Sequence, residues 1–253
     1  MPITISRKFL FRTEYAGTFD SATLQRQLNF YIGPDKSMTY LKHIVFLLLA
    51  GIMLAVHAQP RESIEGVHYQ TLPSPVPTET NEDVIEVRDV FWYGCPECFT
   101  LDPMMTEYRD GVRGDVKMLR MPAVWNDIMA LHARLYYTAV KAGVEDSLHA
   151  AAFSAIHENG NPLRTEAQVK ELFMANGVDA AAFESAWNAE DTVAAVQQAR
   201  LRTTDYDIDK LPAIIVGGRY RVTENANVFN HTELNIAVNL VIRRLRDERR
   251  SDF

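Results

Sequence analysis

The chain has 253 residues but only two cysteines, Cys95 and Cys98, which lie three positions apart at the end of an apolar segment. That segment, Val84 to Tyr93, is rich in β-branched and aromatic residues and is followed by Gly94, so it predicts a strand that leads into a tight turn. A helix is predicted to begin after Cys95, because Pro96 suits the first helical position, where its missing N–H would have no partner. The fold must therefore present two thiols in the first turn of a helix that follows a strand.

This arrangement predicts different chemistry for the two sulfurs. Cys95 is expected to be the N-cap residue, whose sulfur faces unpaired main-chain N–H groups and the positive end of the helix dipole. Both favour the thiolate, so we expect Cys95 to be a solvent-accessible nucleophile with a lowered pKa. Cys98 lies within one turn, where its sulfur can attack a mixed disulfide on Cys95, so it is predicted to be the buried resolving cysteine.

Two other uses of the cysteine pair explain the sequence less well. A structural disulfide between residues three apart would close too small a loop to constrain the unfolded chain much. A zinc site would need two further ligands, and the sequence has neither a second Cys-x-x-Cys nor a closely spaced histidine pair. We therefore expect a redox-active cysteine pair that works without a metal or another cofactor.

The N-terminal part of the chain has the pattern of an export signal. An uncharged run from Ile44 to Val56 follows Lys42, and Val56 and Ala58 are the small residues of an A-x-A-like cleavage site. A retained membrane anchor is the alternative, but the run is short of the roughly 20 apolar residues that a bilayer requires. Counted from Met38 the signal has an ordinary length, so we expect residues 38–58 to be a signal peptide and residues 1–37 an upstream extension or a mis-called start.

The composition after residue 58 restricts the possible partners. These 195 residues carry 20 Lys and Arg against 30 Asp and Glu, which argues against nucleic-acid binding. Their number suits one domain with an insertion. Outside the cytosol a disulfide can persist, so we expect an exported protein, not embedded in the membrane, whose cysteine pair works in the oxidised form.

The pattern along the chain predicts an interrupted α/β fold. Residues 59–83 indicate a linker with an edge strand near residues 67–72, and the fold proper is expected from 84 to 253. A second strand is predicted over Val116 to Met121, and an alanine-rich, all-helical segment follows at about 126–206.

Strand signals return only near the C-terminus of the chain. Leu211 to Val216 is predicted to pair with Arg219 to Val222 across a two-residue turn at Gly217 and Gly218. A final helix is indicated by apolar residues that recur every three to four positions, namely Leu234, Val238, Val241 and Leu245. This order of elements is a thioredoxin fold interrupted by a helical insertion.

Several of these residues together resemble the DsbA family of periplasmic thiol:disulfide oxidoreductases. They are the motif Trp92-Tyr93-Gly94-Cys95-Pro96-x-Cys98, the aromatic Phe99 after it, the insertion after the second strand, and Leu211-Pro212-Ala213 before an apolar strand. The resemblance implies a cis peptide bond at Pro212, although cis bonds occur at only about 5% of X-Pro positions. It also implies that Leu211 and Pro212 bind the main chain of an extended substrate, which an edge strand could do by β-augmentation.

The resemblance assigns further residues to the surroundings of the dithiol. Asp89 lies six residues before Cys95, where the family carries a buried acidic residue, and Arg120 matches another charged position on the neighbouring strand. Asp89 could carry protons to Cys98 or form an ion pair with Arg120, and the sequence leaves both open. Pro96 and Glu97 lie between the cysteines, where the family usually has histidine in place of Glu97, so a glutamate is expected to disfavour the Cys95 thiolate and weaken the oxidant.

The expected function is that of an exported, periplasmic oxidoreductase that passes the Cys95–Cys98 disulfide to reduced exported polypeptides. The resemblance implies that a DsbB-like membrane quinone reductase reoxidises it. Glu97 leaves open a periplasmic reductase or a narrow-client oxidase. A glutathione-dependent transferase or isomerase, or a non-catalytic binding module, fits less well, because neither needs Cys98. Residues 59–83 are too few for the dimerisation region of a disulfide isomerase, and we expect a monomer.

Overall fold

The computed structural model of the chain describes residues 43, 62–112, 114–225, 228 and 230–251. The predicted extension at 1–37 and, except for His43, the predicted signal peptide at 38–58 lie outside the described residues. In the part of the chain that is described, no helix is both long and apolar enough to cross a membrane.

A five-stranded sheet forms the centre of the fold, with the strand order β1-β5-β4-β2-β3. Its strands are β1 (Gln70–Thr71), β2 (Ile85–Phe91), β3 (Val116–Pro122), β4 (Ala213–Val216) and β5 (Tyr220–Thr223). β2 and β3 are parallel, and the other pairs are antiparallel. The predicted strands and the edge strand in the linker are thereby confirmed.

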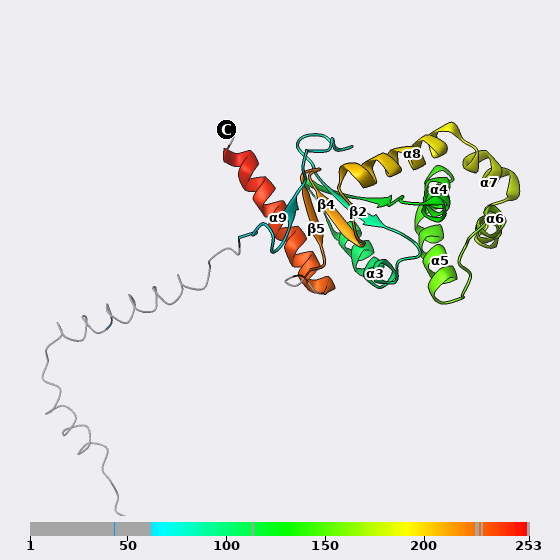
Figure 1. Cartoon of the computed structure of the whole chain (residues 1–253), viewed down its shortest axis with the longest axis horizontal. Coiled ribbons are helices and arrows are strands. Elements are labelled where there is room, and N and C mark those ends of the chain that lie inside the picture. Colours follow the sequence, from blue (N-terminus) through cyan, green and yellow to red (C-terminus); the bar gives the residue numbers. More distant parts are fainter. Residues whose placement is uncertain (1–42, 44–61, 113, 226–227, 229, 252–253) are drawn as a thin grey trace, which may run out of the picture. The chain divides into compact units, whose positions relative to one another are not determined.

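Seven described helices surround the sheet or form the insertion beside it. They are α3 (Pro96–Gly111), α4 (Asp127–Lys141), α5 (Glu145–His157), α6 (Glu166–Ala175), α7 (Ala180–Trp187), α8 (Glu190–Asp205) and α9 (His231–Ser251). In Figure 1 the helices α4 to α8 gather on the right of the sheet and α9 lies on its left. The helical insertion predicted at about 126–206 is confirmed as α4 to α8.

The two faces of β2 pack into different clusters of buried apolar side chains, because successive side chains of a strand point to opposite faces. Ile85 and Val87 pack with Leu101 of α3 and with α9, whose buried side chains include the four predicted ones, Leu234, Val238, Val241 and Leu245. Val90 packs on the other side with β3, β4 and the insertion. The active-site turn at the end of β2 is thus held by both the sheet and the insertion.

Two expectations about the C-terminal hairpin are wrong. Val216 pairs with Tyr220, so the turn has three residues and Arg219 belongs to the loop. β4 lies between β2 and β5 and is not an edge strand, because the short β1 and β5 extend the sheet beyond it. A substrate therefore cannot add to β4 itself, because both of its sides are already paired.

Candidate active site

The active-site turn places Cys95 at the N-cap of α3, as the sequence predicts. The N–H of Cys95 donates to the carbonyl of Trp92 at 3.0 Å, which closes the turn after β2. Pro96 occupies the start of the helix, and the N–H of Cys98 donates to the Cys95 sulfur at 3.1 Å. The sulfur thus takes the place that a serine or aspartate oxygen fills at an ordinary N-cap.

The two thiols have opposite electrostatic surroundings. Hydrogen bonds from the side chain and the N–H of Cys98 lower the pKa of Cys95, although its partial burial and the charge of Glu97 act against this. Burial raises the pKa of Cys98, and its hydrogen bond to Cys95 acts in the same direction. This contrast is the one expected for a nucleophile and its buried partner.

The expected solvent accessibility of Cys95 is wrong for the structure described. Cys95 is only 6% exposed and Cys98 3% exposed, and both cysteines are unbridged. The physical reason is the hydrogen bond to the Cys98 N–H, which holds the Cys95 sulfur against the helix while Pro96 and Glu97 take the exposed positions. Access to the Cys95 sulfur is therefore narrow.

Glu97 lies close enough to influence the dithiol. Its carboxylate oxygen Oε2 is 3.6 Å from the Cys95 sulfur, and its negative charge raises the pKa of Cys95. This is the direction expected from the replacement of a histidine. Because Glu97 is exposed, water screens the interaction and limits its size.

Asp89 lies beneath the dithiol in β2 and is only 4% exposed. Burial raises its pKa to about 7, although the charge of Arg120 acts against this. Its charge in turn contributes to the raised pKa of Cys98. A carboxyl group with this pKa can both accept and release a proton near neutrality.

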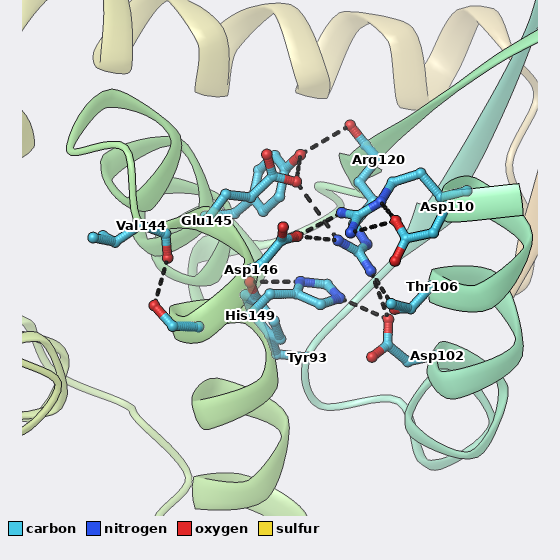
Figure 2. Close-up of polar contacts among 12 residues, drawn as sticks. Tyr93, Asp102, Thr106, Asp110, Arg120, Val144, Glu145, Asp146 and His149 are labelled. Carbon is cyan, nitrogen blue, oxygen red and sulfur yellow. Dashed lines mark hydrogen bonds and ion pairs between the residues drawn. The ribbon is translucent and has the colours of Figure 1, made fainter.

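Arg120 is the strand partner of Asp89 in the sheet register, but it forms its ion pairs elsewhere. Its guanidinium lies 3.4 Å from Asp102 and 3.3 Å from Asp146, and it donates to Thr106 at 2.6 Å. Figure 2 shows this network, in which side chains of α3 and α5 converge on Arg120 of β3. The described contacts thus include no ion pair between Asp89 and Arg120. The charge of Arg120 still lowers the pKa of Asp89 by electrostatic attraction over a longer distance.

The sequence did not identify His149, which joins this network to the active-site turn. His149 of α5 contacts the hydroxyl of Tyr93 through Nδ1 at 3.0 Å and Oδ1 of Asp102 through Nε2 at 2.8 Å (Figure 2). The imidazole is almost fully buried, and burial lowers its pKa, so a neutral ring accepts from Tyr93 and donates to Asp102. The only sequence signal is a histidine on the buried face of an apolar helix, which is too common to indicate a partner.

Leu211 and Pro212 lie at the entrance to β4, and the peptide bond between them is cis, as expected from the resemblance. In the loop between α8 and β4, the last residue with a main-chain hydrogen bond is Ile208. Within the described part of the chain, residues 209–212 make no such bond. Leu211 is half-buried and Pro212 is buried. Leu211 packs against the same apolar cluster that contains both cysteines.

The described residues contain no group of three or more histidine, cysteine or acidic side chains that could hold a metal ion. The chemistry that the arrangement supports is thiol–disulfide exchange, with one sulfur whose thiolate is stabilised and one whose thiolate is not.

Comparison with known proteins agrees with this chemistry. Residues 116–234 match the model of the DSBA-like thioredoxin domain. The thiol:disulfide interchange protein DsbA of Azotobacter vinelandii is 32% identical over 186 residues, which are 71% of this chain and 86% of that protein. The chain belongs to the DsbA family.

Other members of the DsbA family match in sequence and in structure. DsbA of Pseudomonas aeruginosa strain PAO1 is 30% identical over 69% of this chain and 82% of its own length. The crystal structure of Pseudomonas aeruginosa DsbA superimposes with a TM-score of 0.69 at 29% identity and covers 73% of this chain and 95% of that one. DsbA from Xylella fastidiosa gives a TM-score of 0.68 at 26% identity over 74% of this chain and all of that one. This chain is therefore a DsbA-like thioredoxin-fold protein and a thiol:disulfide oxidoreductase, which acts on substrate proteins by dithiol–disulfide exchange.

Proposed function

We propose that this oxidoreductase is exported to the periplasm, where it donates the Cys95–Cys98 disulfide to reduced exported polypeptides. The observation that carries the proposal is the opposite shift of the two thiols, since Cys95 has a lowered pKa and Cys98 a raised one. A stabilised Cys95 thiolate favours the reduced enzyme, and a disulfide whose reduced form is stable is an oxidant.

The transfer takes two exchange steps. A substrate thiolate attacks the Cys95 sulfur, which forms a mixed disulfide, breaks the Cys95–Cys98 bond and leaves Cys98 as a thiolate. A second substrate thiolate then attacks the substrate sulfur of the mixed disulfide, which forms the substrate disulfide and releases the Cys95 thiolate. If the second step stalls, Cys98 attacks Cys95 and releases the substrate in its reduced form, which is the resolving role.

Asp89 supplies the proton that the first step requires. The Cys98 thiolate is released into a buried position where its charge is unfavourable. Asp89 is also buried and has a pKa of about 7, so it holds a proton for part of the time at neutral pH. Arg120 modulates this residue through its charge, and Asp102 acts in the opposite direction.

Leu211 and Pro212 bind the main chain of the substrate. Support comes from the main-chain groups of residues 209–212, which make no loop hydrogen bond within the described part of the chain, and from Leu211, which packs against the apolar cluster that contains both cysteines. Pairing through main-chain groups does not depend on the substrate sequence, which suits an enzyme that acts on many unfolded chains.

The signal-like pattern in the sequence supports the proposed location, and the resemblance to the DsbA family supports the proposed reoxidation partner. Residues 38–58 act as a cleaved signal peptide, so the mature protein begins at Gln59 with a linker that contributes the edge strand β1, and the thioredoxin-like domain follows from residue 84. It works as a monomer, and a DsbB-like membrane quinone reductase restores its disulfide.

The proposal is tested with reduced, unfolded ribonuclease as the substrate and the oxidised mature protein as the oxidant. We expect ribonuclease activity to return with the wild type and not with Cys95→Ser or Cys98→Ser, because neither variant can form the Cys95–Cys98 disulfide. If Cys95 of Cys98→Ser is first converted to a mixed disulfide with glutathione, a ribonuclease thiolate should displace the glutathione and leave ribonuclease bound to Cys95 by a disulfide. The reduction potential, measured in a glutathione buffer, should be higher than that of thioredoxin, about −270 mV. A potential at or below that value, together with no ribonuclease oxidation, would show that the protein is not a disulfide donor.

A further inference from the structure

Arg221 is a buried cation that the dithiol chemistry does not use. It lies in β5, opposite Gln70 of β1 and Ile215 of β4, and its side chain is only 8% exposed. A buried guanidinium is costly to desolvate unless its donors are paired. The identity of its partners therefore indicates which part of the fold depends on it.

The partners of Arg221 lie mainly in the loop that leads to Pro212. Its NH1 group lies 3.2 Å from Asp207 and 3.8 Å from Asp209, and it donates to the carbonyl of Tyr206 at 3.4 Å. Its NH2 group donates to Oε1 of Gln70 at 2.6 Å. One side chain thus joins the edge strand β1 to the loop between α8 and β4.

Besides Arg221, the loop is fixed at Ile208, whose side chain is buried in the core and whose carbonyl accepts from Nε1 of Trp125 at 3.1 Å. Main-chain hydrogen bonds reach only as far as Ile208, and within the described part of the chain none involves residues 209–212. Asp207 has a φ of +49°, a left-handed conformation that is unfavourable for a residue other than glycine. Lys210 adds one contact, from its ammonium group to the carbonyl of Glu224.

These contacts divide the loop into two functional parts. The main-chain groups of residues 209–212 make no loop hydrogen bond among the described residues, while the acidic side chains of Asp207 and Asp209 pair with Arg221. Residues 209–212, which make no such main-chain hydrogen bond, would otherwise lose conformational freedom on binding, and that loss would weaken the affinity. Arg221 contacts neither sulfur in the described interactions, and its ion pairs connect it to the loop.

We propose that Arg221 is a positioning residue, which holds residues 207–210 so that the main chain at Leu211 and Pro212 is pre-arranged for an extended polypeptide. This inference rests on the proposed binding of substrate at Leu211 and Pro212. It goes beyond that binding, because it names the residue that gives the loop its affinity for polypeptides and leaves the dithiol unaffected.

The experiment compares Arg221→Met with Arg221→Lys and with Arg219→Met. Arg219 lies in the same hairpin but is half exposed and pairs with Glu248 at 3.1 Å, so it is the matched control. Two reductants are used: a fluorescent peptide with two cysteines, which can pair with the loop, and dithiothreitol, which has no main chain to pair.

For Arg221→Met we expect KM for the peptide to rise about tenfold with kcat nearly unchanged, as for a loss of binding that is equal in the ground and transition states. The rate with dithiothreitol and the reduction potential should stay at the wild-type values. Arg221→Lys should recover much of the peptide KM, and Arg219→Met should match the wild type. A peptide KM that Arg221→Met leaves unchanged would overturn the inference, as would an equal loss of rate with both reductants.

Two further variants keep the test decisive. If Arg221→Met does not fold, the double variant Asp207→Asn, Asp209→Asn weakens the same contacts from two exposed side chains and should raise KM in the same way. Pro212→Ala distinguishes the proposed role of Arg221 from the proposed binding of substrate at Leu211 and Pro212. If Pro212→Ala raises KM and no Arg221 or aspartate variant does, only the role of Arg221 is rejected, whereas no change in any of them rejects the binding of substrate at Leu211 and Pro212.

Discussion

The main-chain N–H of Cys98 donates a 3.1 Å hydrogen bond to the sulfur of Cys95. One turn of helix thus performs two tasks, because the residue that stabilises the Cys95 thiolate also carries the second thiol into the protein interior, where burial raises its pKa. Much of the asymmetry between the thiols is therefore built into the N-terminus of α3.

The first prediction concerns the order in which the two thiols react. In the reduced protein near pH 7, iodoacetamide should modify Cys95 before Cys98, because the thiolate is the reactive form and only Cys95 has a lowered pKa. Peptide mapping by mass spectrometry at short reaction times measures the order. In denaturant the two rates should become similar. Earlier labelling of Cys98 in the native protein would reverse the proposed roles.

The second prediction concerns the charge between the two cysteines. Glu97→Gln removes a charge whose oxygen lies 3.6 Å from the Cys95 sulfur, so the pKa of Cys95 should fall and the reduction potential should rise. A tenfold change in the exchange equilibrium is about 30 mV, and solvent screening of this exposed residue should keep the shift below that. Glu97→His should have a larger effect in the same direction.

The matched control for the second prediction is Glu107→Gln, an exposed charge further along the same helix. It should leave both the pKa of Cys95 and the potential unchanged. If Glu97→His and the control gave the same potential as the wild type, Glu97 would have no part in the redox properties of the dithiol.

Local sequence was sufficient to predict the strand, the turn and the N-cap of the active site. Gly94 and Pro96 fix where β2 ends and α3 begins, and both effects act within a few residues. Exposure of the Cys95 sulfur could not be predicted in this way. It depends on how the sulfur turns toward the Cys98 N–H and on what the insertion packs against it.

The polar network of Tyr93, His149 and Asp102 could not be predicted from sequence patterns either, because its residues are far apart in the sequence. His149 lies 56 residues from Tyr93 and 47 residues from Asp102, and no spacing rule connects them. Arg88 lies in the middle of β2, where an apolar residue would be expected, and its buried guanidinium donates to Glu86 at 2.6 Å. In that case a signal existed, since residues two apart on a strand point to the same face and can pair.

The third prediction concerns stability and pH through Asp89. Its pKa is raised from 3.8 to about 7, so between these values the folded protein holds a proton that the unfolded chain has lost. Stability from this group is fully present below about pH 3.8 and is lost as the pH rises through 7. Asp89→Asn should therefore stabilise the reduced protein at pH 8, by at most about 4 kcal/mol, and change it little at pH 3.5.

Denaturant unfolding of both proteins across this pH range measures the effect of Asp89. Asp83→Asn, at an exposed position before the same strand, is the control and should show no such dependence on pH. A difference between Asp89→Asn and the wild type that stays constant from pH 4 to pH 8 would contradict the raised pKa.

The fourth prediction concerns the link between the insertion and the active-site turn. His149→Leu leaves the hydroxyl of Tyr93 and the carboxylate of Asp102 without this partner in a buried site, which should cost about 2–3 kcal/mol of unfolding free energy. Tyr93→Phe should cost about 1 kcal/mol. Because Tyr93 and His149 share a 3.0 Å hydrogen bond, the double variant should lose about 1 kcal/mol less than the sum of the single losses.

Denaturant unfolding at pH 8, where the lowered pKa keeps His149 neutral, measures the two single variants and the double variant. Tyr108→Phe is the control, because Tyr108 packs against the sheet core and not against the cluster that contains Tyr93. Combined with His149→Leu, it should give additive losses of unfolding free energy. Additive losses for Tyr93→Phe with His149→Leu would instead mean that the insertion does not hold the active-site turn through this hydrogen bond.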